Sequence, residues 1–268
     1  MVMTYGEMLR SASKKIEKTD AWALLTALLK TDRAGVLCIF NDKAPHDVIA
    51  EYTANIEKRV TQMPVAYITG IKEFYSLEFI VNKDVLIPRP DTEILVSWGI
   101  SEACGKSVLD LCCGSGCIGI SVAVNCECNL TLADISKNAL IIAKNNAKNH
   151  NINAKLLKTD ILTDEIVGEY DIIISNPPYI ETDEIKSLDC DVKDFEPVIA
   201  LDGGAHGLDF YPIIAKKAYY ALKNEGKLAV EIGYKQGDAV KRIFEEYYNN
   251  VKILKDFAGN DRIVIGNK

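Results

Sequence analysis

The sequence predicts an α/β fold: a mostly parallel, seven-stranded sheet with helices on both faces, preceded by a small helical domain and a β-hairpin. Two observations lead to this prediction. From residue 107 onward, short apolar segments alternate with helix-like segments, which is the pattern of βα units. The first ~60 residues contain only short helix-like segments. A chain of 268 residues is long enough for one large domain and one small domain.

Three helices are expected in the N-terminal part. Tyr5–Glu17 is the first, and Ala21–Lys30 follows Thr19-Asp20, whose side chains suit an N-cap. A third helix begins at Pro45, where a missing N–H carries no penalty, and runs to about Val60. Residues 1–70 are therefore predicted to form a helical domain that is too small to hold a large core alone.

A β-hairpin is expected next. Between Glu73 and Ile87, apolar residues alternate with polar ones around a turn at Asn82-Lys83-Asp84. The prolines of Ile87-Pro88-Arg89-Pro90 then favour an extended path. Residues 71–90 are thus predicted to be a β-hairpin linker, and residues 91–268 the larger domain.

The larger domain is predicted to contain seven strands and four helices. The strands are expected at 107–111, 129–133, 155–158, 171–175, 227–232, 251–255 and 262–265, and the helices at 117–125, 136–149, 211–222 and 236–247. Because Gly259-Asn260-Asp261 is a turn signal, the last two strands are expected to form an antiparallel pair.

Composition and charge argue against several classes of protein. Apolar residues make up 48% of the chain and charged residues 26%, which argues against disorder. The longest strongly apolar stretch, Ala21–Leu29, is about half the ~18 residues that a membrane span needs, and the N-terminus lacks the pattern of a secretion signal. We expect a cytoplasmic protein without membrane association. The net charge is −7, and no basic run is present, so direct nucleic-acid binding is not expected.

The eight cysteines do not predict a metal site or a disulfide framework. None of them forms a C-x-x-C pair, and the three histidines lie far from the cysteine cluster in the sequence. Reduced, mostly buried thiols are the expected state.

A glycine-rich segment follows the first strand of the sheet. Gly114, Gly116 and Gly119 match G-x-G-x-x-G between a strand and a helix, a pattern that dinucleotide-binding proteins share. Two carboxylates favour another ligand, since Asp110 would repel a pyrophosphate and Asp134 is placed to accept hydrogen bonds from ribose hydroxyls. The arrangement suits S-adenosyl-L-methionine (AdoMet), with Asp110 near its amino group. The alternative role for Asp110 is that of a helix-capping or turn residue.

A second motif, Asn176-Pro177-Pro178-Tyr179, follows the strand expected at 171–175. Pro177 has no N–H, so the Asn176 side-chain oxygen and the Pro177 carbonyl remain as acceptors beside an aromatic ring. Two acceptors can orient the two N–H bonds of a planar –NH₂ group, and the ring can stack on its plane. The nitrogen lone pair is then directed at an electrophile. A turn with a core tyrosine is the structural alternative.

Together these motifs resemble those of the amino methyltransferases, which modify adenine, cytosine or glutamine nitrogen. Further stretches are similar to the protein-(glutamine-N5) methyltransferases of peptide chain release factors, the HemK/PrmC family. These stretches are Phe74-Tyr-Ser-Leu-Glu-Phe79, Leu86-Ile-Pro-Arg-Pro-Asp-Thr-Glu93, Phe195-Glu-Pro-Val-Ile-Ala-Leu-Asp-Gly-Gly204, Gly207-Leu-Asp-Phe-Tyr211 and Asp261-Arg-Ile-Val264. The resemblance covers almost the whole chain from about Pro64, and implies a Rossmann-like, AdoMet-dependent methyltransferase domain.

The resemblance also implies where the site residues lie. It places the AdoMet contacts at Asp110, Cys112, Cys113, Gly114, Ser115, Gly116, Asp134, Asp160, Ile161 and Asn176, and the amide receptor at Asn176, Pro177, Pro178 and Tyr179, with Asn176, Pro177 and Tyr179 as catalytic residues. The chain departs from the family where Gly-Thr is usual, at Cys112-Cys113, and at Ile161, where an aromatic residue is common. Losing the first glycine matters only if that position needs a positive φ.

The implied reaction is methyl transfer from AdoMet to the glutamine of the Gly-Gly-Gln loop of class I release factors, without a metal. Residues 1–70 and the hairpin would then dock the substrate. Four alternatives stay open: a ribosomal-protein glutamine as substrate, an adenine methyltransferase, an AdoMet-binding regulatory module and a nicotinamide oxidoreductase. Arg89 and His206 stay without an assigned role.

Overall fold

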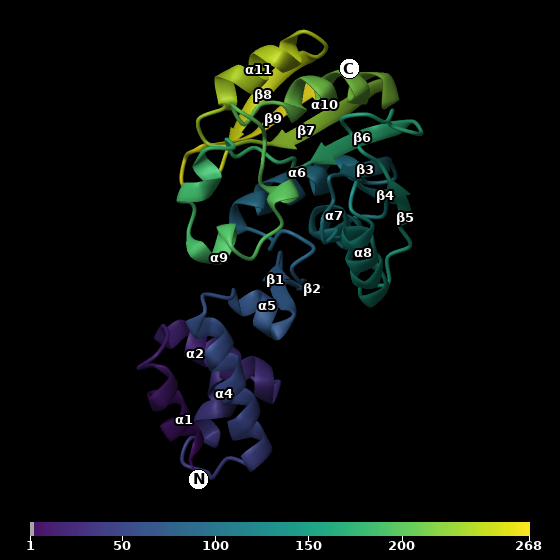
Figure 1. Ribbon diagram of the computed structural model, residues 1–268. Helices are drawn as coiled ribbons and strands as arrows, with labels where there is room; N and C mark the ends of the chain where they lie inside the picture. The colour runs from purple at the N-terminus through teal and green to yellow at the C-terminus, as the bar shows by residue number, and fades with distance from the viewer. Residues whose placement is uncertain (1–2) are drawn as a thin grey trace. The chain divides into compact units, whose positions relative to one another are not determined.

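The computed structural model describes residues 3–268, and the chain divides into two compact units. The first unit comprises Met1–Ile71 and Asp189–Phe195, and the second comprises Lys72–Leu188 and Glu196–Lys268. The helices and strands of both units are labelled in Figure 1. Among the described residues, no helix combines the length and the apolarity needed to cross a bilayer.

The first unit is helical. Its helices are α1 (Tyr5–Ala12), α2 (Lys18–Leu29), α3 (Arg33–Cys38), α4 (His46–Val60), α5 (Val65–Thr69) and the short α9 (Cys190–Lys193). A capping box starts α1, because the Thr4 hydroxyl accepts from Glu7 N while the Glu7 carboxylate accepts from Thr4 N. The first predicted helix was too long, and α3 and α5 were not predicted because five or six residues are too few to show a period.

The second unit is built on one seven-stranded sheet. Its strands are β3 (Ser107–Leu111), β4 (Asn129–Asp134), β5 (Lys155–Lys158), β6 (Tyr170–Ser175), β7 (Leu222–Glu231), β8 (Asn249–Lys255) and β9 (Asp261–Asn267). They lie in the order β5-β4-β3-β6-β7-β9-β8. Strands β3 to β7 pair in parallel, whereas β9 lies antiparallel between β7 and β8. The predicted sheet, including its antiparallel end, is confirmed.

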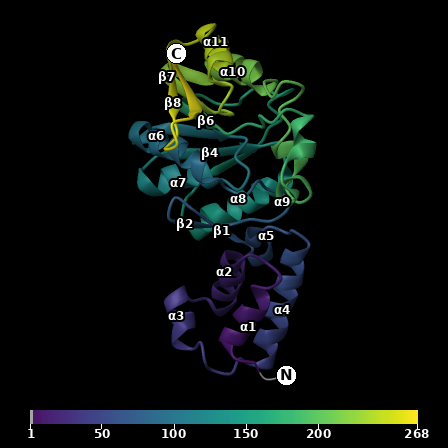
Figure 2. The same ribbon diagram turned by 90° about the vertical axis from the view of Figure 1, so that its left-hand side faces the viewer.

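Helices cover both faces of this sheet, as the two views in Figures 1 and 2 show. One face carries α6 (Glu93–Ala103), α7 (Cys117–Asn125) and α8 (Lys137–Asn149), and the other carries α10 (Phe210–Ala221) and α11 (Gly237–Glu245). A hydrophobic core lies on each face of the sheet, and neighbouring residues of a strand pack into different cores. Val108 packs on the face covered by α6, α7 and α8, and Leu109 on the face covered by α10 and α11. Helix α6 was not predicted, because Ile94–Ile100 is apolar on nearly all sides and shows no one-sided stripe.

The predicted hairpin exists, but its turn lies elsewhere. Strands β1 (Ile71–Phe74) and β2 (Leu77–Ile80) are joined by Tyr75-Ser76, and not at Asn82-Lys83-Asp84 as expected. Both turn residues have a positive φ, of 51° and 60°, as tight hairpins require. Tyr-Ser is not a usual sequence for such a turn, so no local signal predicts it. Residues Asn82 and Asp84 form a separate turn, in which Asp84 N donates to Asn82 Oδ1 at 2.9 Å.

Candidate active site

A cavity opens at the carboxyl ends of β3, β4 and β6, the edge where open α/β sheets bind ligands. Asp84, Val85, Leu86, Pro88 and Arg89 also line it, and we call the segment of residues 84–89 the strap. Of the residues predicted for the site, those in the cavity wall are Cys112, Cys113, Gly114, Ser115, Asp134, Asp160, Ile161, Asn176 and Pro178. The remaining four, Asp110, Gly116, Pro177 and Tyr179, do not belong to the lining residues.

The loop after β3 depends on left-handed backbone. Cys112, Gly114 and Gly116 have φ values of 59°, 53° and 78°. A Cβ on Gly114 would meet no atom within 4 Å, so its backbone conformation, and not crowding, favours glycine there. Cys112 adopts a positive φ at a position where glycine is usual in the family. The chain therefore holds a non-glycine residue in a conformation that L-residues disfavour.

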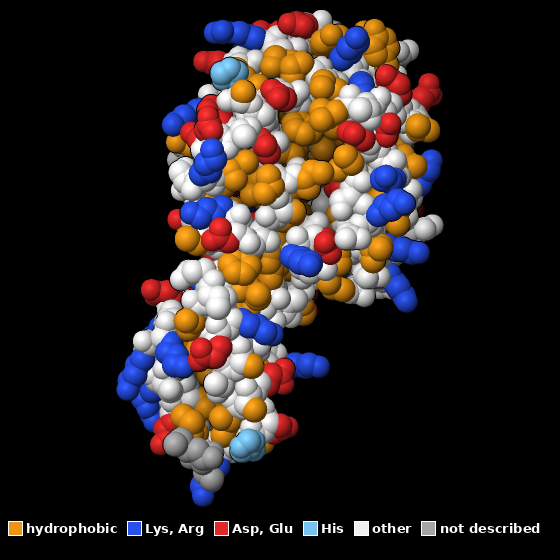
Figure 3. Space-filling view, viewed as in Figure 1, with side chains coloured by type: hydrophobic (Ala, Val, Ile, Leu, Met, Phe, Trp, Pro, Cys, Tyr) orange, Lys and Arg blue, Asp and Glu red, His pale blue; other side chains and the backbone are white. Residues whose placement is uncertain are grey.

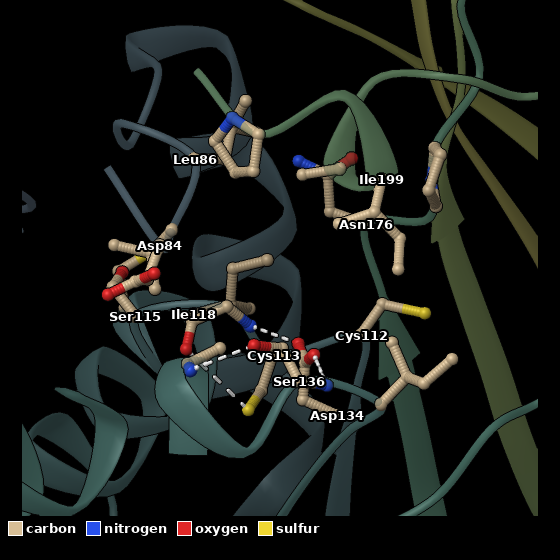
Figure 4. Close-up of a pocket in the computed structure, with 18 of the residues that line it drawn as sticks. Asp84, Leu86, Cys112, Cys113, Ser115, Ile118, Asp134, Ser136, Asn176 and Ile199 are labelled. Atoms are coloured by element: carbon tan, nitrogen blue, oxygen red, sulfur yellow. Dashed lines mark hydrogen bonds between the residues drawn. The ribbon is translucent and has the colours of Figure 1, made fainter. Parts of the chain in front are cut away.

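Asp134 joins this loop to the loop after β4. Its Oδ2 accepts from Gly114 N and its Oδ1 from Ser136 N, each at 2.8 Å (Figure 4). Burial raises the pKa of this carboxyl, and the backbone hydrogen bonds oppose that shift. Each carboxylate oxygen has more than one lone pair, so Asp134 can also accept hydrogen bonds from a ligand in the cavity.

Asp110 lies behind the loop and is completely buried. Its Oδ2 accepts from Gly119 N at 2.8 Å, at the start of α7, while Oδ1 has no partner among the described residues. Burial raises the pKa of Asp110 to about 7. A Cβ on Gly119 would lie 2.9 Å from Asp110 Cβ, so this glycine permits α7 to pack on β3. The position agrees with the helix-capping role that was the alternative for Asp110.

Asn176 presents its amide at the cavity wall (Figure 4). Its Nδ2 donates to Thr92 Oγ1 at 3.5 Å, a long hydrogen bond that directs the nitrogen to Thr92 and leaves Oδ1 for another donor. Thr92 itself is buried and also faces the carboxylate of Glu231. Burial raises the pKa of Glu231 to about 7.

Tyr179 is not among the residues that line the cavity. Its hydroxyl donates to Glu231 Oε1 at 3.3 Å, and its carbonyl accepts from Gln236 Nε2 at 3.0 Å. Glycines from a later loop pack against this segment: a Cβ on Gly207 would lie 2.3 Å from Tyr179 O, and one on Gly203 would lie 2.7 Å from Tyr179 Cα. These close contacts explain why glycine occupies both positions.

The strap is fixed by one buried carboxylate. Glu196 forms an ion pair with Arg89, and its Oε2 accepts from Ile87 N at 3.0 Å. The Glu196 side chain is 1% exposed and that of Arg89 is 36% exposed. Arg89 thus lines the cavity with its charge paired, whereas His206 is exposed and is not a lining residue.

Sequence reasoning missed much of the wall. The missed lining residues include Asp84, Leu86, Thr92, Ile118, Ile135, Ser136, Leu162, Ile199 and Phe210. Three of the four charged lining residues, Asp84, Asp134 and Asp160, are acidic, and the single basic one is Arg89. A wall of this charge suits a cationic ligand with apolar parts better than a pyrophosphate. The residues present therefore fit AdoMet, whose sulfonium and ammonium groups are positive.

Comparison with known proteins agrees with this architecture. Residues 90–189 match the Methyltransferase small domain family, and residues 4–70 match the PrmC N-terminal domain family. A solved methyltransferase from Pyrococcus furiosus has a TM-score of 0.57 and 19% identity, over 82% of this chain and 96% of that one. At that identity the likeness concerns the fold alone.

Curated relatives are more similar. The release factor glutamine methyltransferase of Clostridium botulinum is 39% identical, over 100% of this chain and 98% of its own length. That of Clostridium acetobutylicum is 40% identical, over 96% of this chain and 94% of its own length. Identity of this level over nearly complete chains establishes the family: the chain belongs to the release factor glutamine methyltransferases.

Proposed function

We propose that this chain transfers the methyl group of AdoMet to the side-chain amide nitrogen of the glutamine in the Gly-Gly-Gln loop of class I peptide chain release factors. The products are N5-methylglutamine and S-adenosyl-L-homocysteine. The observation that carries the proposal is the Asn176 amide at the cavity wall, with its nitrogen on Thr92 and its oxygen available. Family membership, at 39% identity over the full chain, supports the same reaction.

AdoMet supplies an electrophilic methyl group, and the residues of the chain bind and orient the two reactants. Cys112–Ser115 and Asp134, which line the cavity, would hold the donor, and Asp160 and Ile161 would contact its adenine. Asn176 Oδ1, at the cavity wall, would accept a hydrogen bond from one N–H of the substrate amide. The Pro177 carbonyl, which lies next to the lining residues Asn176 and Pro178 in the chain, would accept a hydrogen bond from the other N–H. Accepting these bonds favours the positive charge that develops on nitrogen as its lone pair forms the new C–N bond and the C–S bond breaks. The amide then loses a proton to water.

Charge distribution supports a protein substrate over a nucleic acid. On the face of the second unit seen in Figure 3, Asp and Glu side chains lie among the Lys and Arg side chains over most of the surface, several Lys and Arg side chains lie together at the right-hand edge, and hydrophobic side chains gather between the charged ones. A phosphate backbone is normally bound by a continuous basic surface. We further propose that residues 1–70 and the hairpin segment 71–90 dock the release factor, and that residues 91–268 carry out the transfer.

The test is a transfer assay with labelled AdoMet and a purified class I release factor, beside a copy whose Gly-Gly-Gln glutamine is alanine. Label on the first alone supports both reaction and site. Label on a ribosomal protein or on adenine instead would overturn the substrate and keep the chemistry. Asn176→Ala is expected to lower kcat about 100-fold while the AdoMet dissociation constant changes little. A loss confined to AdoMet affinity would contradict the role given to Asn176.

A further inference from the structure

A buried amide on α8 contacts two segments that frame the cavity. Asn146 is fully buried, and its side chain makes three hydrogen bonds. Its Oδ1 accepts from Ile80 N at 2.7 Å, and its Nδ2 donates to Ile80 O at 3.0 Å and to Ser115 O at 2.9 Å. Both N–H groups of the amide are therefore used, in bonds of good length.

These partners belong to different parts of the site. Ile80 ends β2, and the strap begins four residues later, at Asp84. Ser115 belongs to the loop after β3 and lines the cavity. A second residue of α8, Asn138, donates from Nδ2 to Asp84 Oδ1 at 3.2 Å, within the strap. One helix thus holds both the proposed donor-binding loop and the chain that leads into the strap.

Packing alone does not account for an amide at position 146. Its helix neighbours Ala143 and Ala147 belong to the hydrophobic core, and a leucine would fill a similar volume without polar atoms. An amide is unfavourable in such a place unless its hydrogen bonds are made. The bonds that Asn146 makes are directional, and they set the position of two backbone segments that do not pair with each other.

We propose that Asn146 is a positioning residue for AdoMet binding. It fixes the loop after β3 relative to the end of β2. The structural stability of the β1–β2 hairpin and the affinity for AdoMet are therefore coupled. The inference rests on the proposed function, because it takes AdoMet as the ligand of the cavity.

The test compares AdoMet dissociation constants, measured by calorimetry, for the full chain and two leucine variants. Asn146→Leu is expected to bind AdoMet about tenfold more weakly, because Ser115 O and the backbone of Ile80 lose their partner. Asn145→Leu is the matched control, since Asn145 is the exposed neighbour on the same helix, and its affinity should equal that of the unmodified chain.

Hydrogen exchange adds a measurement that a merely structural role would leave unchanged. In the unmodified chain, AdoMet is expected to slow exchange at the amides of β2 other than Ile80, because the Ile80 N–H itself loses its partner in Asn146→Leu. In Asn146→Leu this ligand-dependent protection of β2 should be lost. If Asn146→Leu does not fold, Asn138→Ala is the second variant, because it removes only the exposed hydrogen bond to Asp84. About threefold weaker binding of AdoMet supports the coupling between α8 and the cavity, and an unchanged affinity overturns it.

The two proposals fail in different ways. If the unmodified chain does not bind AdoMet, the proposed function is wrong. If it binds AdoMet, and a folded Asn146→Leu binds equally well with the same ligand-dependent protection in the rest of β2, the positioning role is wrong and the proposed function stands.

Discussion

Cys112 occupies a backbone conformation that its side chain disfavours. Its φ of 59° places a Cβ in the left-handed region, where an L-residue is less stable than glycine by roughly 1–2 kcal/mol. The thiol is half-buried and packs against the core on the α10 and α11 face of the sheet. Burial among acidic neighbours raises its pKa, so the thiol stays protonated at neutral pH.

Two substitutions separate the backbone effect from the loss of sulfur. Cys112→Gly is expected to be about 1 kcal/mol more stable than Cys112→Ala, because both lose the thiol but only alanine keeps a Cβ at positive φ. At Cys113, which is not among the residues of positive φ, the order should reverse and alanine should be the more stable. Urea unfolding of the four variants measures both differences, and the same order at both positions would contradict the argument.

The site residues that the sequence predicted best are those at strand ends. Asp134 and Asn176 come directly at or after β4 and β6, and parallel strands bring their carboxyl ends to one edge. Asp110 lies one residue inside β3, and its side chain is covered by α7. The position of Tyr179 depends on contacts with Glu231 and Gln236, from distant parts of the chain, which no local pattern reveals.

The strap depends on an ion pair between two segments that are about a hundred residues apart in the sequence. Arg89→Met is expected to lower the free energy of unfolding by about 2 kcal/mol, because a cation paired with the buried Glu196 is removed, with a discount for the exposure of Arg89. In a Glu196→Gln background, the same substitution should change stability by less than about 1 kcal/mol. A double-mutant cycle by urea unfolding gives the coupling, and equal losses in both backgrounds would rule it out.

Among the helices and strands, those whose apolar residues recur with a clear period were predicted, and those without such a period were not. From β3 to α8, strands and helices alternate along the chain, and this alternation predicted the parallel sheet. The alternation from Glu73 to Ile87 predicted a hairpin, but with its turn at Asn82-Lys83-Asp84. The turn at Tyr75-Ser76 is held by a distant group, since Glu93 Oε1 accepts from Tyr75 N at 3.0 Å. A contact across the fold replaced the glycine or asparagine that a local signal requires.

For the molecule as a whole, buried acids give a pH dependence of stability. Burial raises the pKa of Asp110 and of Glu231 to about 7, while in the unfolded chain both titrate near 4. Between these values the folded state binds more protons, so stability falls as the pH rises from about 4 to about 7.

We expect the free energy of unfolding, without ligand, to be about 4 kcal/mol higher at pH 5.5 than at pH 7.5, about 2 kcal/mol from each carboxyl. Urea titrations at the two pH values measure the difference. Glu231→Gln should reduce it, because one of the two responsible carboxyls no longer titrates. A free energy that rises with pH across this range would show that other groups dominate.

The place of β9 between β7 and β8 has a consequence for how the chain assembles. Strand β8 pairs only with β9 among the described strands, and the hairpin of these two is a local pairing, whereas β9 and β7 pair across a longer stretch of chain. Until β9 pairs with it, β7 is an open edge whose backbone groups from Lys227 to Glu231 are free to pair with another chain. Pairing with β9 therefore closes this edge of β7 to association with another chain.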